Sequence, residues 1–180
     1  MQRSPVSKAL FQAMRAAMPW LRGVLYRTTV VRRVLSSRRV KPSANAQCPC
    51  GSTFKLKKCC GVFHRGRPAA PLTLMRARYT AYAIGNVRFL MDTTHPEGPH
   101  ARNDRRQWRA DLTEHCRATT FEGLTIHSHN VGDDTARAKV TVTAHLSQAG
   151  GDVGFTERSL FLRDGARWKY HSGEMVQAPE

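Results

Sequence analysis

Four cysteines that stand close together in the sequence are the residues best suited to chemistry. They are Cys48, Cys50, Cys59 and Cys60. Cys48 and Cys50, two positions apart in an extended chain, point to the same side. Four thiolates at about 2.3 Å complete a tetrahedral zinc site with no open coordination position. The sequence therefore predicts one zinc ion, structural rather than catalytic, bound by these four residues.

The residues between the two cysteine pairs favour a metal-binding turn over disulfides. Gly51 permits a sharp turn after Cys50. Ser52 is predicted to cap a short helix that returns the second cysteine pair to the first. Adjacent cysteines and a one-residue gap make unstrained local disulfides difficult. A module this small cannot bury a useful core, so we expect metal binding to supply most of its folding free energy, on the order of 10 kcal/mol.

His64 is the only competing ligand close to the cysteines. Its imidazole could replace Cys60 in the site or hydrogen-bond to a ligand sulfur, and we favour Cys60 as the ligand. Basic side chains near the cysteines would lower the thiol pKa values and offset the negative charge of a four-thiolate site. They are Lys55, Lys57, Lys58, Arg65 and Arg67.

Other residues with metal-binding or nucleophilic potential give weaker signals. His127 and His129 share one face of a predicted strand, but two histidines without a third ligand do not define a metal site. Cys116 lies on the apolar face of a predicted helix and is expected to be buried packing. Neither a glycine-rich phosphate loop nor a serine nucleophile elbow occurs in the sequence.

Helices are predicted directly after the cysteine-rich segment. Pro71 suits the first turn of a helix, and apolar residues then recur at helical intervals up to Gly85, which fits a C-terminal stop. Asn86 is predicted to cap a short second helix. A third helix with an apolar face is expected at about residues 104–117.

The last third of the chain changes to the two-residue period of β-strands. Asp164-Gly165 is a strong two-residue hairpin signal, and Gly150-Gly151 separates two of the strands. Helices followed by an antiparallel meander predict an α+β domain. The predicted strands span residues 121–129, 136–146, 153–163 and 166–171.

Basic charge is concentrated in the first half of the chain. Residues 1–91 carry 18 Lys and Arg and no acidic residue, whereas residues 92–180 carry 11 basic and 13 acidic residues. Residues 1–46 read as a basic tail: disordered, transit-like, or a short amphipathic helix at a membrane surface. No apolar run is long enough to span a bilayer, and the few, clustered cysteines indicate a reducing compartment. We therefore expect a cytoplasmic protein, with organellar targeting by residues 1–46 as the alternative.

Several motifs, taken together, resemble those of a bacterial protein family. Cys48-Pro49-Cys50-Gly51-Ser52 followed by Lys57-Lys58-Cys59-Cys60-Gly61 resembles the SEC-C zinc motif, known from the C-terminal tail of the SecA translocation motor. Further stretches look like the bacterial YchJ family over about residues 47–174. They are Phe63-His64-Arg65-Gly66, Leu74 to Tyr82, Thr94-His95-Pro96, Glu157-Arg158-Ser159 and Gly165 to Tyr170.

The resemblance implies a two-part fold. It implies a SEC-C zinc knuckle at residues 47–66, which we call the knuckle. A cone-shaped α+β domain similar to nuclear transport factor two would follow at 67–174, with helices packed on a curved antiparallel sheet. Residues 1–46 lie outside the resemblance, and residues 175–180 would form a C-terminal tail.

The resemblance also bears on the site residues. It implies that Cys48, Cys50, Cys59 and Cys60 are the metal ligands, and it carries no established reaction. Thr94 and Phe121 stand where tryptophans are usual in the family.

If the protein is an enzyme, analogy with other cone-shaped domains places its active site in a pocket inside the cone. Glu157 and Ser159 alternate onto one face of a strand, so the Glu157 carboxylate could point inward with a raised pKa, and His95 could be its acid–base partner. We favour the alternative that Glu157 pairs with Arg76 or Arg78 and that the aromatic residues are core. The candidate pocket residues are Tyr79, Tyr82, His95, Glu157, Ser159, Trp168 and Tyr170.

Binding is favoured over catalysis as the function. In SecA the SEC-C knuckle docks a chaperone through a small basic surface, and the lysines here keep that character, so we expect an accessory protein that engages an acidic protein surface. Binding of nucleic acid or an anionic membrane through the basic N-terminal half is the alternative, although the aromatic platforms and reading helices of recognition modules are missing from the sequence. An enzyme acting on an unnamed ligand in the cone is the third hypothesis.

Overall fold

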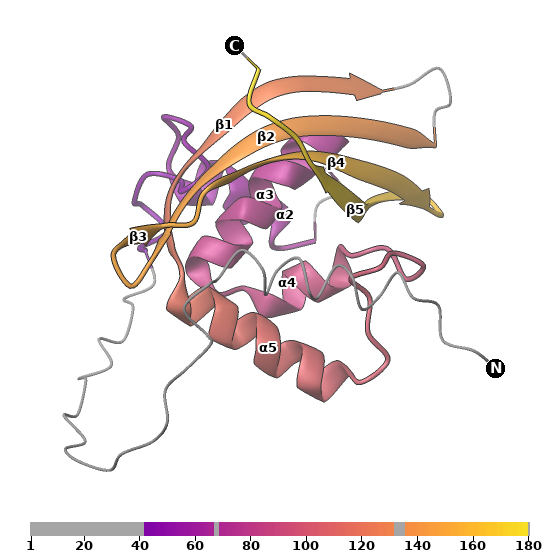
Figure 1. Cartoon of the computed structure of the whole chain (residues 1–180), viewed down its shortest axis with the longest axis horizontal. Helices are drawn as coiled ribbons and strands as arrows, with labels where there is room; N and C mark the ends of the chain where they lie inside the picture. Colours follow the sequence, from indigo (N-terminus) through magenta and orange to yellow (C-terminus); the bar gives the residue numbers. More distant parts are fainter. Residues whose placement is uncertain (1–41, 67–68, 132–135, 180) are drawn as a thin grey trace. The chain divides into compact units, whose positions relative to one another are not determined.

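An antiparallel sheet with helices on one face makes up most of the part of the chain that the structure describes (Figure 1). The structure is a computed structural model and describes residues 42–66, 69–131 and 136–179. The basic tail expected at residues 1–46 therefore lies, up to residue 41, outside the described residues. Within the described ranges, no helix is long and apolar enough to cross a membrane.

Three helices follow the knuckle, as the sequence predicts. They are α3 (Pro71–Ile84), α4 (Val87–Asp92) and α5 (Arg105–Ala118). Helix α3 ends at Gly85, whose φ of 72° is left-handed and suits glycine. The Asn86 side chain caps α4 by accepting a hydrogen bond from the Phe89 amide. The Asp104 side chain caps α5 in the same way and satisfies two amides of its first turn.

The strands form a meander in which each long strand pairs with the next along the chain. They are β1 (Thr120–Val131), β2 (Arg137–Gln148), β3 (Gly151–Asp152), β4 (Phe155–Asp164) and β5 (Arg167–Met175). The order across the sheet is β1-β2-β4-β5, and the short β3 pairs with β2. The predicted α+β class is confirmed.

Two details of the strand prediction need correction. The tight turn between β4 and β5 consists of Gly165 and Ala166, one residue later than predicted, because Asp164 still pairs with Arg167. Strand β5 also continues past the predicted end at residue 171 to Met175. The register shifts near Leu160 and Phe161, where β5 contributes one extra residue, and pairing resumes beyond it.

Helix α3 lies across the concave face of the sheet and anchors the core (Figure 1). Leu74 packs against Val140, Val142 and Phe161 from the central strands. Farther along the helix, Ala81 joins a second cluster with α4 and α5. The buried members of that cluster are Ala81, Val87, Leu90, Met91, Trp108 and Cys116, so Cys116 is packing as predicted.

Candidate metal centre

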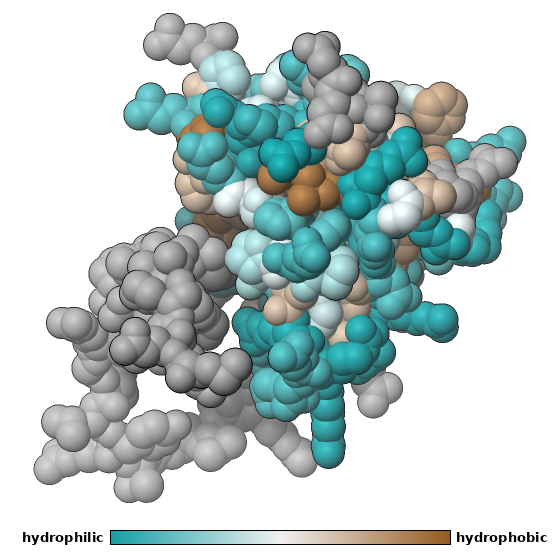
Figure 2. Space-filling view, turned by 90° about the vertical axis from the view of Figure 1, so that its right-hand side faces the viewer, coloured by the Kyte–Doolittle hydropathy of each residue, from teal (hydrophilic) through white to brown (hydrophobic). Residues whose placement is uncertain are grey.

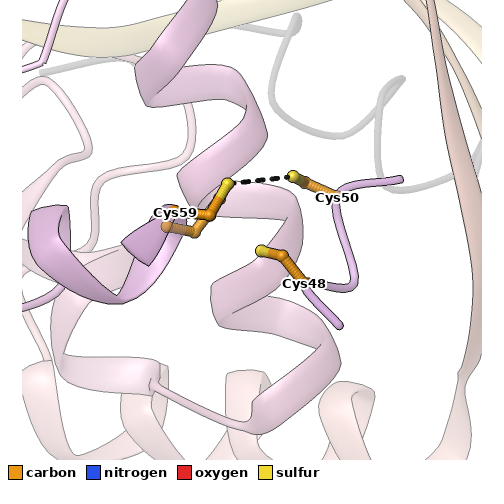
Figure 3. Close-up of side chains that lie close together, drawn as sticks. Cys48, Cys50 and Cys59 are labelled. Atoms are coloured by element: carbon orange, nitrogen blue, oxygen red, sulfur yellow. Dashed lines mark hydrogen bonds between the residues drawn. The ribbon is translucent and has the colours of Figure 1, made fainter. Parts of the chain in front are cut away.

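The four cysteine sulfur atoms of the knuckle converge. All four lie within 4.8 Å of one another, and the side chains of Cys48, Cys50 and Cys59 point toward one another (Figure 3). The Cys50 and Cys59 sulfurs are 3.7 Å apart, and those of Cys59 and Cys60 are 3.9 Å apart. A tetrahedron with metal–sulfur bonds of about 2.3 Å has edges of about 3.8 Å. The spacing therefore fits a four-coordinate metal ion, whereas disulfide bonding would need a sulfur separation of about 2 Å.

A tight turn and two short helices hold these sulfurs in place. Gly51 has a φ of 80° and turns the chain directly after Cys50, as predicted. The 3-10 helix η2 (Leu56–Lys58) and helix α2 (Cys60–Phe63) then flank Cys59. A Cβ atom on Gly61 would lie 2.6 Å from the Leu56 carbonyl oxygen. Glycine at this position therefore lets α2 approach η2 closely enough to close the site.

The predicted role of Ser52 as a helix cap is wrong. The capping position of η2 is Lys55, and it makes no side-chain capping bond. The Ser52 hydroxyl instead lies 3.1 Å from the Cys59 sulfur. Because three residues separate Ser52 from the first residue of η2, its hydroxyl is not at the capping position and contacts the sulfur instead. A hydroxyl donor at this position orients the sulfur and stabilises its thiolate form.

Helix α3 supplies a supporting layer for the knuckle that sequence reasoning missed. The Thr80 hydroxyl is 3.6 Å from the Cys48 sulfur, and the Arg76 guanidinium donates to the Cys50 carbonyl oxygen at 3.1 Å. Ala77, fully buried, packs against the cysteine cluster. These three residues share one helical face by their spacing, which is visible in the sequence. The sequence does not show that this face meets the knuckle.

His64 takes neither of the two roles considered for it. Its Nε2 lies 2.8 Å from the Ala77 carbonyl oxygen, and because a carbonyl only accepts, Nε2 carries the proton. Its ring packs against Phe89 at a centroid distance of 4.6 Å. Burial lowers the pKa of His64 more than its hydrogen bond to Ala77 raises it, which favours the neutral ring. The sulfur cluster contains Cys60 and does not contain His64.

The clustered thiols compete for negative charge. Hydrogen bonds from Cys48 and Cys60 lower the pKa of Cys50. Hydrogen bonding to Cys48 and Cys50, together with burial, raises the pKa of Cys60. Burial likewise raises the pKa of Cys59. A divalent cation would remove this competition because it stabilises every thiolate at once.

Three of the predicted pocket residues meet inside the sheet. Glu157 and Ser159 lie on the same face of β4, and the Ser159 hydroxyl donates to Glu157 Oε1. The Tyr170 hydroxyl donates to the same oxygen at 3.2 Å. Gly173 on the neighbouring strand has no side chain, and the Glu157 carboxylate occupies that space.

The expected partners of Glu157 need correction. Within the described residues, Glu157 forms no ion pair with Arg76 or Arg78. Arg76 donates instead to the Cys50 carbonyl oxygen, and Arg78 donates to the Leu90 carbonyl oxygen at 3.0 Å. Among the described residues, Glu157 accepts hydrogen bonds from Ser159 and Tyr170 and none from His95. The His95 amide donates to the Tyr170 carbonyl oxygen, which places the His95 ring against the His171 ring at 5.5 Å.

Comparison with known proteins identifies the family to which this arrangement belongs. The model of the YchJ middle NTF2-like domain matches residues 70–173, which is more than half of the chain. The chain belongs to the YchJ family. A UPF0225 protein of Cupriavidus pinatubonensis (strain JMP 134 / LMG 1197) is 34% identical over 150 residues, covering 79% of this chain and 97% of the relative.

Two solved structures of SEC-C motif-containing proteins have a similar fold. The solution structure of such a protein from Rhodopseudomonas palustris matches with a TM-score of 0.60 and 29% identity, covering 73% of this chain and 100% of that one. A crystal structure from Psychrobacter arcticus matches with a TM-score of 0.61, covering 76% of this chain and 86% of that one. Its identity of 19% supports the fold alone. The expected NTF2-like domain is thereby confirmed.

Phe121 and Thr94 stand at the two positions where tryptophan is usual in the YchJ family, and both side chains make contacts in this structure. Phe121 packs between Tyr79 and Tyr82, with ring centroids at 5.6 and 6.2 Å. Burial in this cluster raises the pKa of Tyr79 to about 12. The Thr94 hydroxyl donates to the Leu90 carbonyl oxygen at 2.8 Å. Tyr79 and Tyr82 are therefore part of the aromatic packing, as the favoured alternative expected.

His127 and His129 do not share a face of the sheet, so that prediction is wrong. The register of β1 shifts between Ile126 and Ser128, which makes His127 the extra residue of a bulge. His127 Nε2 lies 2.7 Å from the Thr143 hydroxyl, whereas His129 is opposite Val140. Thr143 and Val140 are three residues apart on β2 and face opposite sides, so the two histidines do as well.

Proposed function

We propose that Cys48, Cys50, Cys59 and Cys60 bind one structural zinc ion and that the zinc-bound knuckle is a protein-interaction module. The observation that carries the proposal is the convergence of four sulfurs at tetrahedral spacing. Four soft thiolate ligands without an open position suit zinc and leave no site for a substrate. The ion would supply a cross-link between the two cysteine pairs. Ser52 and Thr80 would orient the sulfurs of Cys59 and Cys48.

The outer surface of the knuckle supports the interaction role. Phe54 is 64% exposed, an unusual position for a large apolar side chain. Exposed lysines follow it in sequence at positions 55, 57 and 58, and within the described residues none of them forms an ion pair. We call Phe54, Lys55, Lys57 and Lys58 the knuckle patch. An apolar anchor among unpaired cations suits a partner surface that is acidic around an apolar spot.

Capture of partners with matched variants tests this function. The full-length chain is immobilised and exposed to bacterial extract, alongside the double variant Lys57→Glu/Lys58→Glu and the variant Arg106→Glu. Arg106 is an exposed cation on α5 and serves as the control. We expect an acidic protein to be retained by the wild type and by Arg106→Glu, and to be lost from the double variant.

Two results would contradict the interaction role. One is the same set of captured proteins from all three chains, because the knuckle patch would then be irrelevant. The other is retention of DNA at about 0.2 M salt, which would favour polyanion binding through the basic N-terminal half.

A further inference from the structure

A groove lies between the knuckle, helix α4 and the beginning of strand β5. Its volume is about 420 Å³, which is enough for one or two side chains of a bound segment. The aromatic side chains that line it are Phe63 from α2, Phe89 from α4 and Trp168 from β5, each half-buried. The turn between β4 and β5 lies at the right-hand edge of the sheet in Figure 1. Figure 2 views that side and shows mostly hydrophilic surface, with apolar residues confined to small areas.

Basic side chains dominate the rim of this groove. Four cations and one carboxylate line it, and two of the cations are already paired. Lys169 is 2.7 Å from Asp164, and Arg88 is 3.5 Å from Asp92. Arg65 and Arg167, in contrast, have no carboxylate partner within the described residues. The rim therefore offers two exposed and unneutralised cations beside an aromatic floor.

The aromatic floor is held in place before any ligand binds. The Arg163 guanidinium lies over the Trp168 ring at 4.7 Å and donates to the Ala166 carbonyl oxygen at 2.9 Å. The His64 ring packs against Phe89 and is itself bonded to α3 through the Ala77 carbonyl. Fixed aromatic side chains lose little conformational entropy when a ligand is seated on them. Together with arginine, aromatic residues are the ones that contribute most at protein interfaces.

We propose that this groove binds an acidic segment of a partner protein, with one apolar side chain seated among the aromatic residues and flanking carboxylates at Arg65 and Arg167. The proposal rests on the interaction function proposed above and adds a second contact site to the knuckle patch. The charge of the rim argues against the chain's own N-terminal segment as the occupant. Residues 1–41 contain ten Lys and Arg and no acidic residue, so the rim would repel them.

A fluorescent peptide provides the direct test. The probe is Glu-Glu-Phe-Leu-Glu-Glu with an N-terminal dye, and its anisotropy is measured against the full-length chain at about 0.1 M salt. A second probe has Ala-Ala in place of Phe-Leu and keeps all four carboxylates. The protein variants are Arg167→Glu in the groove, Lys57→Glu/Lys58→Glu in the knuckle patch, and Arg106→Glu as the exposed control. All three replace solvent-exposed residues, and circular dichroism verifies that each variant is folded.

The expected result separates the groove from the knuckle patch. Arg167→Glu weakens binding of the Phe-Leu probe at least tenfold, and Arg106→Glu changes it less than twofold. The Ala-Ala probe binds the wild type at least tenfold more weakly than the Phe-Leu probe. A fall in affinity in the knuckle double variant that is smaller than the fall in Arg167→Glu places the peptide in the groove.

Several outcomes would overturn the proposal. Equal affinity for both probes would show that the carboxylates alone account for binding and that the apolar side chains contribute nothing. A loss confined to the knuckle double variant, or unchanged binding in every variant, would reject the groove. The proposed interaction function of the knuckle patch would then be decided by the capture experiment alone. A tenfold gain in affinity on deletion of residues 1–41 would assign the groove to the chain's own segment. Two competitors test other classes of partner, a single-stranded 20-nucleotide DNA and anionic vesicles. If either displaces the peptide at a lower concentration than unlabelled peptide does, the groove is assigned to that class of partner.

Discussion

Arg78 shows how much a single side chain can organise in this fold. It is only 5% exposed, yet it has no carboxylate partner within the described residues. Its Nη1 donates to the Leu90 carbonyl and the Thr93 hydroxyl, at 3.0 and 2.7 Å, and its guanidinium lies 4.6 Å from the centre of the Tyr170 ring. One planar cation thus joins α3, the end of α4 and β5. Lysine cannot reproduce this combination of forked donors and ring stacking.

Arg78→Lys is accordingly expected to lower the free energy of unfolding by about 2 kcal/mol, because buried acceptors lose a donor and the ring loses its cation. Chemical denaturation measures the change. Arg106→Lys on the surface of α5 is the control and should shift stability by less than about 0.5 kcal/mol. Equal small effects of both substitutions would show that Arg78 has no special structural role.

The elements of the knuckle depend on close backbone approach as well as on the four cysteine side chains. The amide of Leu56 donates to the Ala46 carbonyl at 2.8 Å, and the amide of Cys48 donates to the Phe54 carbonyl at 3.0 Å. These bonds fold the chain back on itself before α2 begins. Gly61 then brings α2 against η2, so the spacing of the sulfurs follows from the packing of two very short helices.

Gly61→Ala tests this packing. The added methyl group would collide with the Leu56 carbonyl oxygen, and overpacking of this kind costs about 2 kcal/mol. If that cost falls on the metal-bound form, zinc affinity drops about 30-fold, as measured by competition with a chelating dye. Gly151→Ala, whose Cβ would make an ordinary contact of 3.6 Å with the Gln148 carbonyl oxygen, should leave the affinity within twofold. Similar affinities for both variants would contradict the account of the knuckle.

The sequence predicted those elements whose signals are local. Gly85 and Asn86 mark helix ends because each satisfies or redirects backbone groups within one turn, and both were assigned correctly. The β-bulge at His127 escaped prediction because it depends on how β1 aligns with β2. The partners of Arg78 and Glu157 escaped it as well, since each is contributed by a different element. The four cysteines could be named from the sequence. The contact between Thr80 and the Cys48 sulfur could not, because it depends on how α3 packs against the knuckle.

At the scale of the whole molecule, a cluster of polar groups inside the sheet should make stability depend on pH. His100 packs near Tyr170, with ring centroids 5.7 Å apart. Burial lowers the pKa of His100, with smaller contributions from Arg78, Arg102 and His171, while Glu157 opposes the shift. The folded-state pKa is thus below the unfolded value of 6.5. As pH falls through that region, the unfolded chain takes up the proton first, and the folded state loses stability.

His100→Gln isolates this contribution. Between pH 7.5 and pH 5.5, the variant should lose less unfolding free energy than the wild type, because one depressed histidine pKa has been removed. Urea denaturation at both pH values provides the measurement, and acid-induced loss of metal affects both chains alike. A steeper loss in the variant would mean that His100 is protonated more readily in the folded state, the reverse of the expected sign.

Native mass spectrometry of the purified full-length chain tests whether one zinc ion on four cysteines closes the knuckle. We predict one zinc per chain for the wild type, for His64→Gln and for Cys116→Ala. Zinc should be lost from Cys50→Ser and from Cys60→Ser, which remove one of four ligands. Loss of zinc from His64→Gln with retention in Cys60→Ser, or a wild-type chain that carries no zinc and has oxidised cysteines, would rule out a zinc site made of the four cysteines.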